Sequence, residues 1–108
     1  MLKRTIAREG VICFSLLLCT ILDTRGRPAN TPEYCEKQGK KLRASFEAYL
    51  RRGDIYAKYS ENQYLLLCIG AEKENAADIG ARIDMDYRKR CGGRGGISYR
   101  LLDDGSMW

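Results

Sequence analysis

Residues 51–69 read RRGDIYAKYSENQYLLLCI, and this stretch decides the fold. The segment 55–59 is rich in β-branched and aromatic residues, and the segment 64–69 is a short apolar run typical of a buried strand. The stretch therefore predicts two antiparallel strands joined by a turn of about four residues. The turn holds a hydroxyl, one carboxylate and two amides, a combination that points away from catalysis: Ser60, Glu61, Asn62 and Gln63.

A helix is predicted on each side of this hairpin. Upstream, Thr31 suits an N-cap and Pro32 the first helical position, and the helix is expected to run to about Arg52. Its apolar face is expected to consist of Cys35, Leu42, Phe46, Tyr49 and Leu50. Downstream, the second helix should span about 71–90, and its inner face is expected to consist of Ala76, Ile79, Gly80, Ile83 and Tyr87.

The first 22 residues have two interpretations. A basic segment at 1–8 and an apolar run at 11–22 give the outline of a secretory signal peptide, which would be cleaved near Ala29 to leave a small secreted basic protein. However, Glu9 lies beside the apolar run, and the segment 23–27 is charged where a cleavage region should be small and neutral. We favour the alternative, in which the run from 11 to 22 is a buried central strand.

The order of elements predicts the fold class. A last strand is expected at 97–102, after a glycine-rich loop at 91–96, so the order is strand, helix, strand, strand, helix, strand. Right-handed crossovers then give an α+β, ferredoxin-like fold, with a four-stranded antiparallel sheet and both helices on one face. A chain of 108 residues corresponds to a single domain over 1–108, with its core at about 10–102.

Composition restricts the chemistry. The chain has no histidine, the commonest general base and metal ligand, and its five cysteines include no CxxC pair. We therefore expect no metal and no other cofactor, and we expect reduced thiols in the cytoplasm rather than at a membrane. The net charge of +5 permits an anionic partner, but the basic residues of the first helix are interpreted as a solvated face: Lys40, Lys41, Arg43, Arg51 and Arg52.

An RNA-binding domain of the same fold is a further alternative. Such a domain needs aromatic side chains on the open face of its sheet, and the candidates are Tyr56, Tyr64 and Tyr99. The RNP pattern is absent around them, and packing between strands accounts for these tyrosines equally well.

The hairpin and its flanks resemble a known family. The segment 51–83 is similar to the GGDEF domain of diguanylate cyclases, in which the corresponding stretch reads roughly R-x-x-D-x-x-A-R-Y-G-G-D-E-F. Residues 58–64, KYSENQY, resemble the hairpin R-Y-S-x-x-Q-[FY] of degenerate GGDEF-like domains at the C-terminus of clostridial-type bacterial transcriptional activators (BTAD or SARP-like proteins). The resemblance implies a regulatory domain that is a fragment of a longer regulator and leaves DNA contact to another domain.

The same resemblance implies a degenerate cyclase site. In an active cyclase the turn glycines let the backbone approach the GTP phosphates, and the acidic pair binds Mg²⁺. Here Ser60 and Glu61 stand at the glycine positions, and Asn62 and Gln63 stand at the acidic positions. The end of the first strand, at 19–22, carries no second metal aspartate. The resemblance therefore implies a domain that has no catalytic residues and is not an enzyme.

One ligand motif of the family is present. Arg51 and Asp54 match the R-x-x-D inhibitory site, in which the arginine contacts the phosphate and guanine edges of cyclic di-guanylate. An arginine fork suits both groups. The resemblance thus implies a cyclic di-guanylate sensor as an alternative to a domain that contacts a protein partner or other domains of the same regulator.

Overall fold

The computed structural model describes residues 5–7, 10–12, 14–50, 53–69 and 73–103. These ranges contain six strands and two helices, in the order β1 (Thr5–Ala7), β2 (Gly10–Ile12), β3 (Phe14–Leu22), α1 (Pro32–Tyr49), β4 (Ile55–Ser60), β5 (Gln63–Ile69), α2 (Lys73–Arg90) and β6 (Gly96–Asp103). In the described part of the chain, no helix is long and apolar enough to cross a membrane.

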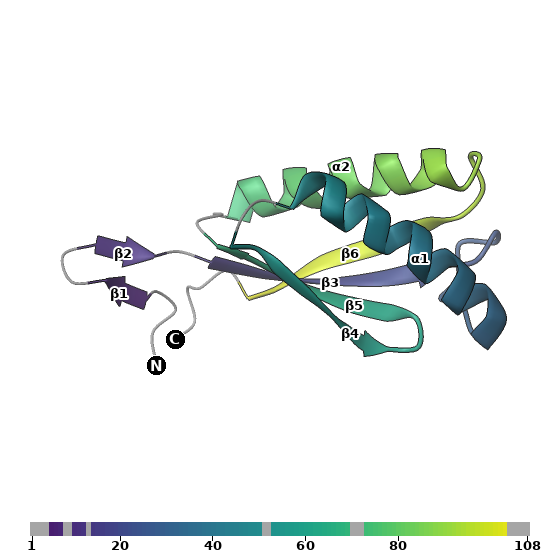
Figure 1. The fold of residues 1–108 in the computed structure, drawn as a ribbon, viewed down its shortest axis with the longest axis horizontal. Coiled ribbons are helices and arrows are strands. Elements are labelled where there is room, and N and C mark those ends of the chain that lie inside the picture. The colour runs from purple at the N-terminus through teal and green to yellow at the C-terminus, as the bar shows by residue number, and fades with distance from the viewer. Residues whose placement is uncertain (1–4, 8–9, 13, 51–52, 70–72, 104–108) are drawn as a thin grey trace.

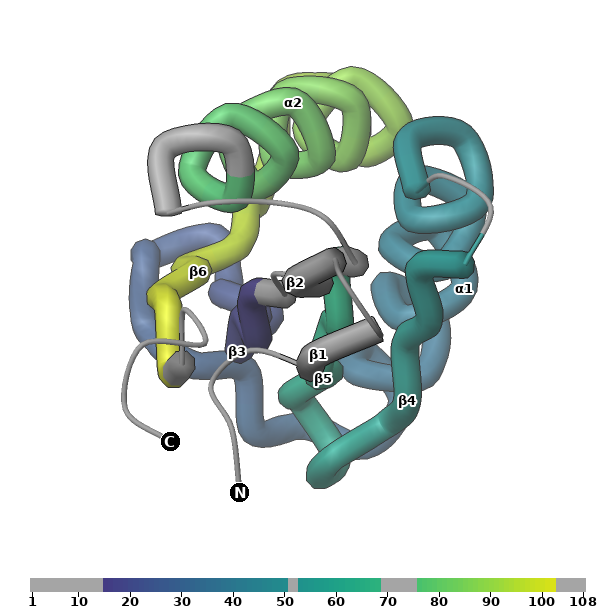
Figure 2. The backbone as a smooth tube through the Cα atoms, turned by 90° about the vertical axis from the view of Figure 1, so that its left-hand side faces the viewer, coloured from purple at the N-terminus to yellow at the C-terminus, as the bar shows by residue number. Residues whose placement is uncertain are grey.

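Four of the strands form one antiparallel sheet in the order β4-β5-β3-β6. β3 lies inside this sheet, where Leu17 is paired with Leu66 of β5 on one side and with Leu101 of β6 on the other. Both helices cover the same face of the sheet (Figures 1 and 2). The predicted α+β, ferredoxin-like arrangement is therefore confirmed.

The beginning of the chain differs in part from the prediction. The apolar run does form the central strand, but β3 begins at Phe14, and residues 10–12 instead form β2. β2 pairs with β1 in a separate two-stranded sheet, with Thr5 opposite Ile12. Because β3 pairs on both sides, removal of the first 29 residues would take away the centre of the larger sheet.

The end of α1 also differs. The helix ends at Tyr49 rather than near Arg52, because Leu50 already has an extended backbone, with φ −77° and ψ 143°. Arg51 and Arg52 lie outside the described residues. Tyr49, predicted on the apolar face, is 42% exposed, whereas Leu50 packs against the core.

The core lies between the helices and the covered face of the sheet. Side chains at alternate positions of each strand point into it, as expected for a strand with one covered face. The buried strand residues on this face include Ser15, Leu17, Cys19, Ile21, Tyr64, Leu66, Cys68 and Ile97, and Leu18 is buried on the other face. The buried residues of the helices include Cys35, Leu42, Phe46, Ala76, Ile83 and Tyr87, which confirms most of both predicted faces.

Two buried polar residues join the helices to one another. Ser45 Oγ of α1 lies 2.6 Å from Asp86 Oδ2 of α2, and Tyr87 Oη donates to Gln38 Oε1 over 3.3 Å. The Ser45 hydroxyl and the nearby Arg90 guanidinium hold the pKa of Asp86 below its ordinary value. Satisfied hydrogen bonds explain how polar side chains are accommodated between two helices.

The three candidate tyrosines face the helices, not the open side of the sheet. Tyr64 is buried, and its hydroxyl accepts a hydrogen bond of 2.7 Å from Arg43. The Tyr56 hydroxyl lies 3.1 Å from Glu47 Oε2 of α1, and Tyr99 packs against α2. These residues thus do not form the aromatic platform that an RNA-binding sheet needs, and their packing in the fold, the other explanation given for them, is the one that the structure supports.

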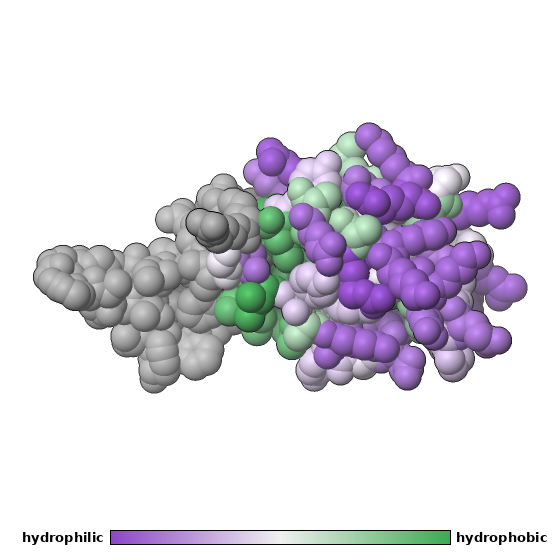
Figure 3. Space-filling model, in the orientation of Figure 1, coloured by the Kyte–Doolittle hydropathy of each residue, from purple (hydrophilic) through white to green (hydrophobic). Residues whose placement is uncertain are grey.

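The other face of the sheet carries no helix in the described part of the chain. The strand registers place apolar side chains over much of this open face, namely Leu16, Leu18, Ile55, Ala57, Leu65 and Leu67. At the end nearer the hairpin turn the side chains are polar, namely Thr20, Gln63, Ser98 and Arg100. By contrast, most of the surface visible over α1 and α2 is hydrophilic (Figure 3).

Two helix glycines allow the helices to approach the sheet closely. A Cβ atom on Gly39 would lie 2.7 Å from the Tyr64 hydroxyl, and one on Gly80 would lie 2.5 Å from the Tyr99 ring. Glycine inside a helix costs about 1 kcal/mol relative to alanine. The close packing of the two tyrosines accounts for the presence of glycine at both positions.

We predict that Gly80→Ala lowers stability, although alanine is the better helix former. The added methyl group would collide with the Tyr99 ring, and overpacking of this kind costs about 1–3 kcal/mol. Urea denaturation measures the effect. Ala77→Gly, at an exposed position of α2, is the control and should lose about 1 kcal/mol from helix propensity alone. A higher denaturation midpoint for Gly80→Ala would contradict the close packing.

Candidate functional site

The hairpin turn is shorter than predicted. β4 ends at Ser60 and β5 begins at Gln63, and these two residues are paired with each other, so only Glu61 and Asn62 form the turn. The register shifts between Lys58 and Ser60, which leaves one residue bulged out of the ladder. Ser60 and Gln63, which were predicted in the turn, therefore belong to the strands β4 and β5.

The polar side chains around the turn form one hydrogen-bonded cluster. Ser60 Oγ lies 3.2 Å from Asn62 Oδ1 and 2.9 Å from Gln63 Oε1, so its hydroxyl has two amide oxygens within reach. Gln63 Nε2 lies 3.3 Å from Thr20 Oγ1 on the central strand. Three of the four predicted turn residues therefore come together, while Glu61 is exposed at the tip.

The loop after β3 folds back onto this turn. Asn62 Nδ2 donates to the carbonyl oxygen of Ala29 over 2.6 Å, and the Asn62 carbonyl oxygen accepts from the Ile21 amide over 2.8 Å. The Ala29 amide donates to the Ile21 carbonyl over 2.9 Å, and Ala29 is only 1% exposed. The inner side of the turn is thus filled by the chain's own loop.

A small cavity lies beside the turn on the open face of the sheet. Its volume is about 340 Å³, and it is lined by Leu18, Thr20, Pro28, Asn62, Gln63, Ser98 and Arg100. Amide and hydroxyl groups with one arginine offer hydrogen bonds but no carboxylate. Within the described ranges, no three His, Cys, Asp or Glu side chains gather in a way that could hold a metal ion.

The first carboxylate after the central strand has a local structural role. Asp23 Oδ1 accepts hydrogen bonds from the backbone amides of Arg25 and Arg27, at 2.8 and 3.0 Å. These bonds hold the pKa of Asp23 below its ordinary value. The sequence analysis did not predict this turn, although aspartate followed by glycine in a loop is a common signal for one.

The R-x-x-D pair is described only in part. Arg51 lies outside the described residues, and Asp54 is half-buried just before β4. The role of Arg51 and Asp54 in binding cyclic di-guanylate therefore stays a prediction.

The described cysteines are free thiols: Cys19, Cys35, Cys68 and Cys91. Burial, with smaller contributions from Cys68 and Asp84, raises the pKa of Cys19 to about 12. A thiol with so high a pKa is a poor nucleophile at neutral pH. Cys19 is thus a core residue.

Comparison with known proteins bears on the fold. No protein-family model matches the chain, and no curated protein matches it. Among solved structures, a DGC (diguanylate cyclase) protein from Thermotoga maritima is similar, with a TM-score of 0.64 and 21% identity over 90% of this chain and 70% of that chain. The chain has a diguanylate-cyclase-like fold.

A phage SAM lyase in complex with S-methyl-5'-thioadenosine is more distant. Its TM-score is 0.42, and its identity is 13% over 87% of this chain and 83% of that chain. The GGDEF-like interpretation of the fold therefore depends on the cyclase, and at 21% identity that likeness concerns the fold alone.

We predict that Asn62→Ala loosens the loop without unfolding the protein. The variant loses the hydrogen bond to Ala29, which is worth about 1 kcal/mol, so the Ala29 amide should exchange its hydrogen about fivefold faster. Hydrogen-exchange NMR measures this rate. Glu61→Ala, in the same turn but exposed, is the control and should leave the rate unchanged. Equal rates in both variants would show that the Asn62 side chain does not hold the loop.

Proposed function

We propose that this chain is a GGDEF-like domain without cyclase activity that serves a regulatory or interaction role in a cytoplasmic bacterial transcriptional regulator. The observation that carries the proposal is the closed hairpin turn, whose side chains bind one another and the loop at Ala29. The cyclase-like fold supports the GGDEF-like part of the proposal. The resemblance of residues 58–64 to the activators' hairpin supports the regulatory part.

The chemistry of the turn argues against phosphoryl transfer. Mg²⁺ prefers carboxylate and phosphate oxygens, and neutral amides are weak substitutes for them. The Asn62 amide also directs its nitrogen, a hydrogen-bond donor, toward the Ala29 carbonyl. The Asp23 carboxylate, the first after β3, is engaged by two backbone amides of its own loop. Neither side chain is arranged as a metal ligand.

We predict that the intact protein makes no cyclic di-guanylate or pyrophosphate from GTP and Mg²⁺. The double variant Asn62→Asp, Gln63→Glu restores both acids of the turn, and we expect it also to lack activity because the second metal aspartate is still missing at the end of the first strand, at 19–22. Chromatography of the reaction products is the measurement, and an active GGDEF cyclase is the positive control. Product formed by the unmodified protein would overturn the proposal, and product formed by the variant alone would show that the missing aspartate at the end of the first strand does not prevent catalysis.

The open face of the sheet is the surface proposed for interaction. Ile55 is 58% exposed there, and the half-buried leucines of the neighbouring strands on this face are Leu16, Leu65 and Leu67. Large exposed apolar groups on one face commonly mark a protein contact. Arg100 lies on this face beside Leu18. We therefore propose as the partner an amphipathic helix that carries an acidic residue to meet Arg100.

We predict that a photo-crosslinking amino acid at Ile55 joins the chain to such a partner in its own cells. Arg100→Glu should abolish this adduct, because the charge pairing becomes repulsive. Mass spectrometry identifies the adduct, and the same crosslinker at Ala48, exposed on α1, is the control. An adduct that forms equally from Ala48, that survives Arg100→Glu, or that joins two copies of the chain would contradict the proposal.

A further inference from the structure

The small cavity beside the hairpin turn is built from side chains that the strand registers place next to one another. Gln63 and Ser98 are the residues directly opposite Thr20 on the two neighbouring strands, so these side chains stand in one row, about 5 Å apart. Leu18 and Arg100 are opposite each other in the next row of the same face. Leu18 is only 8% exposed, although this is the open face of the sheet. The cavity thus has polar groups around a buried apolar floor.

The walls of this cavity are held by hydrogen bonds and by the backbone. Gln63 Oε1 lies 2.9 Å from Ser60 Oγ, and Gln63 Nε2 donates to Thr20 Oγ1 over 3.3 Å, so both ends of the amide are fixed. Pro28 forms another part of the wall, and a β-bridge joins its backbone to Leu22. The volume of about 340 Å³ lies at the lower end of the usual range for small-molecule sites, which are mostly formed before the ligand binds.

The polar groups of the cavity favour an anion. Because Thr20 Oγ1 accepts the hydrogen bond from Gln63, its own hydrogen can point toward a ligand. Ser98 and Arg100 are exposed beside it and add a second hydroxyl and a guanidinium. Asp103, further along β6 on the same face, is not among the lining residues. The lining therefore presents one positive charge and no negative one.

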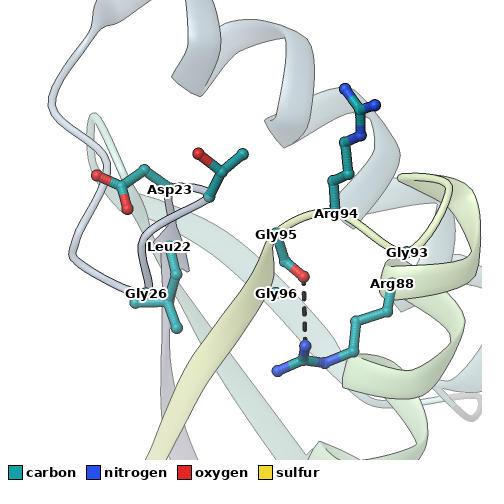
Figure 4. Close-up of a pocket in the computed structure, with 9 residues that line it drawn as sticks. Leu22, Asp23, Gly26, Arg88, Gly93, Arg94, Gly95 and Gly96 are labelled. Carbon is teal, nitrogen blue, oxygen red and sulfur yellow. Dashed lines mark hydrogen bonds between the residues drawn. The ribbon is translucent and has the colours of Figure 1, made fainter.

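A second and larger cavity, of about 580 Å³, has a different lining. It lies between the loop after β3 and the loop between α2 and β6, and its lining is mostly glycine backbone and charged side chains (Figure 4). Arg88 comes from α2 and donates to the Gly95 carbonyl over 3.4 Å, and Arg94 comes from the loop that follows (Figure 4). Arg94 is thus an exposed arginine that belongs to another cavity. The small cavity instead combines its arginine with an apolar floor and wall.

We propose that the small cavity binds a small organic acid with a short hydrocarbon chain, and that Arg100 is the principal contact of the carboxylate. Two parallel N–H groups of a guanidinium match the two oxygens of a carboxylate. The hydroxyls of Thr20 and Ser98 can donate to the same oxygens, and Leu18 and Pro28 can pack against the hydrocarbon chain. The inference goes beyond the proposed function, because it assigns a small-molecule ligand that needs no protein partner.

The test is an NMR titration of the intact protein with butyrate, acetate, butyramide and inorganic phosphate, each used separately at the same ionic strength. Saturable shifts are expected for the amides of Thr20, Gln63 and Ser98. Butyrate should bind more tightly than acetate, because its longer chain reaches Leu18 and Pro28. Butyramide lacks the charge and phosphate lacks the hydrocarbon chain, so both should bind at these amides more weakly than butyrate does.

Variants assign the contacts. Arg100→Gln should weaken butyrate binding at least tenfold, a loss of about 1.4 kcal/mol. Arg100→Lys keeps the charge but loses the fork, so it should also weaken binding. Thr20→Val keeps the shape of the side chain but removes its hydroxyl, and it should weaken binding about fivefold. Arg94→Gln, which removes an exposed arginine outside the small cavity, is the matched control and should leave the dissociation constant unchanged.

Three results would overturn the proposal. An equal loss of affinity in Arg94→Gln and Arg100→Gln would indicate only general charge attraction. Binding of butyramide or phosphate at these amides as tight as that of butyrate would show that the cavity does not select a carboxylate with a hydrocarbon chain. Absence of saturation up to about 30 mM of either acid would show that no such site is formed. A thermal midpoint for each variant confirms that it is folded. Because the titration uses the isolated chain, its outcome is independent of the partner proposed for the open face.

Discussion

The pairing of β3 on both sides is the constraint on which the rest of the structure depends. Its residues at 15, 17, 19 and 21 form the floor of the core, and the residues between them belong to the open face. Both helices pack on that floor, and both cavities adjoin its carboxyl end. The run from 14 to 22 carries apolar residues on both faces, although the helices cover one face of the sheet. An apolar central strand and a signal-like segment consequently have the same composition.

Local patterns predicted the elements well where one periodicity dominated. The period of 3.6 in α2 gave the correct inner face, and the apolar run at 64–69 correctly predicted a strand. Local patterns did not predict which polar residues are buried, where the hydrogen-bond partner is distant in the sequence. Gln38 and Ser45 are buried because Tyr87 and Asp86 satisfy them from the other helix. No window of neighbouring residues contains that information.

The candidate site was likewise predicted from the sequence only in part. The residue types at the hairpin turn could be taken from the sequence, and they do lie together. The length of the turn could not be predicted from the sequence, because it depends on a bulge and on the pairing of Ser60 with Gln63. The contact between Asn62 and Ala29 joins positions that only the folded loop brings together. Arg88 and Arg94 were likewise unremarkable in a basic segment until the fold placed them opposite the loop after β3.

The loop from residue 23 to 29 links the two regions physically. One end lines the larger cavity at Asp23 and Gly26, and the other end lies beneath the hairpin turn at Ala29. The loop is short and is fixed at both ends, by the Asp23 turn and by the backbone pair between Ile21 and Ala29. A displacement at one end must therefore be absorbed within a few residues or passed to the other.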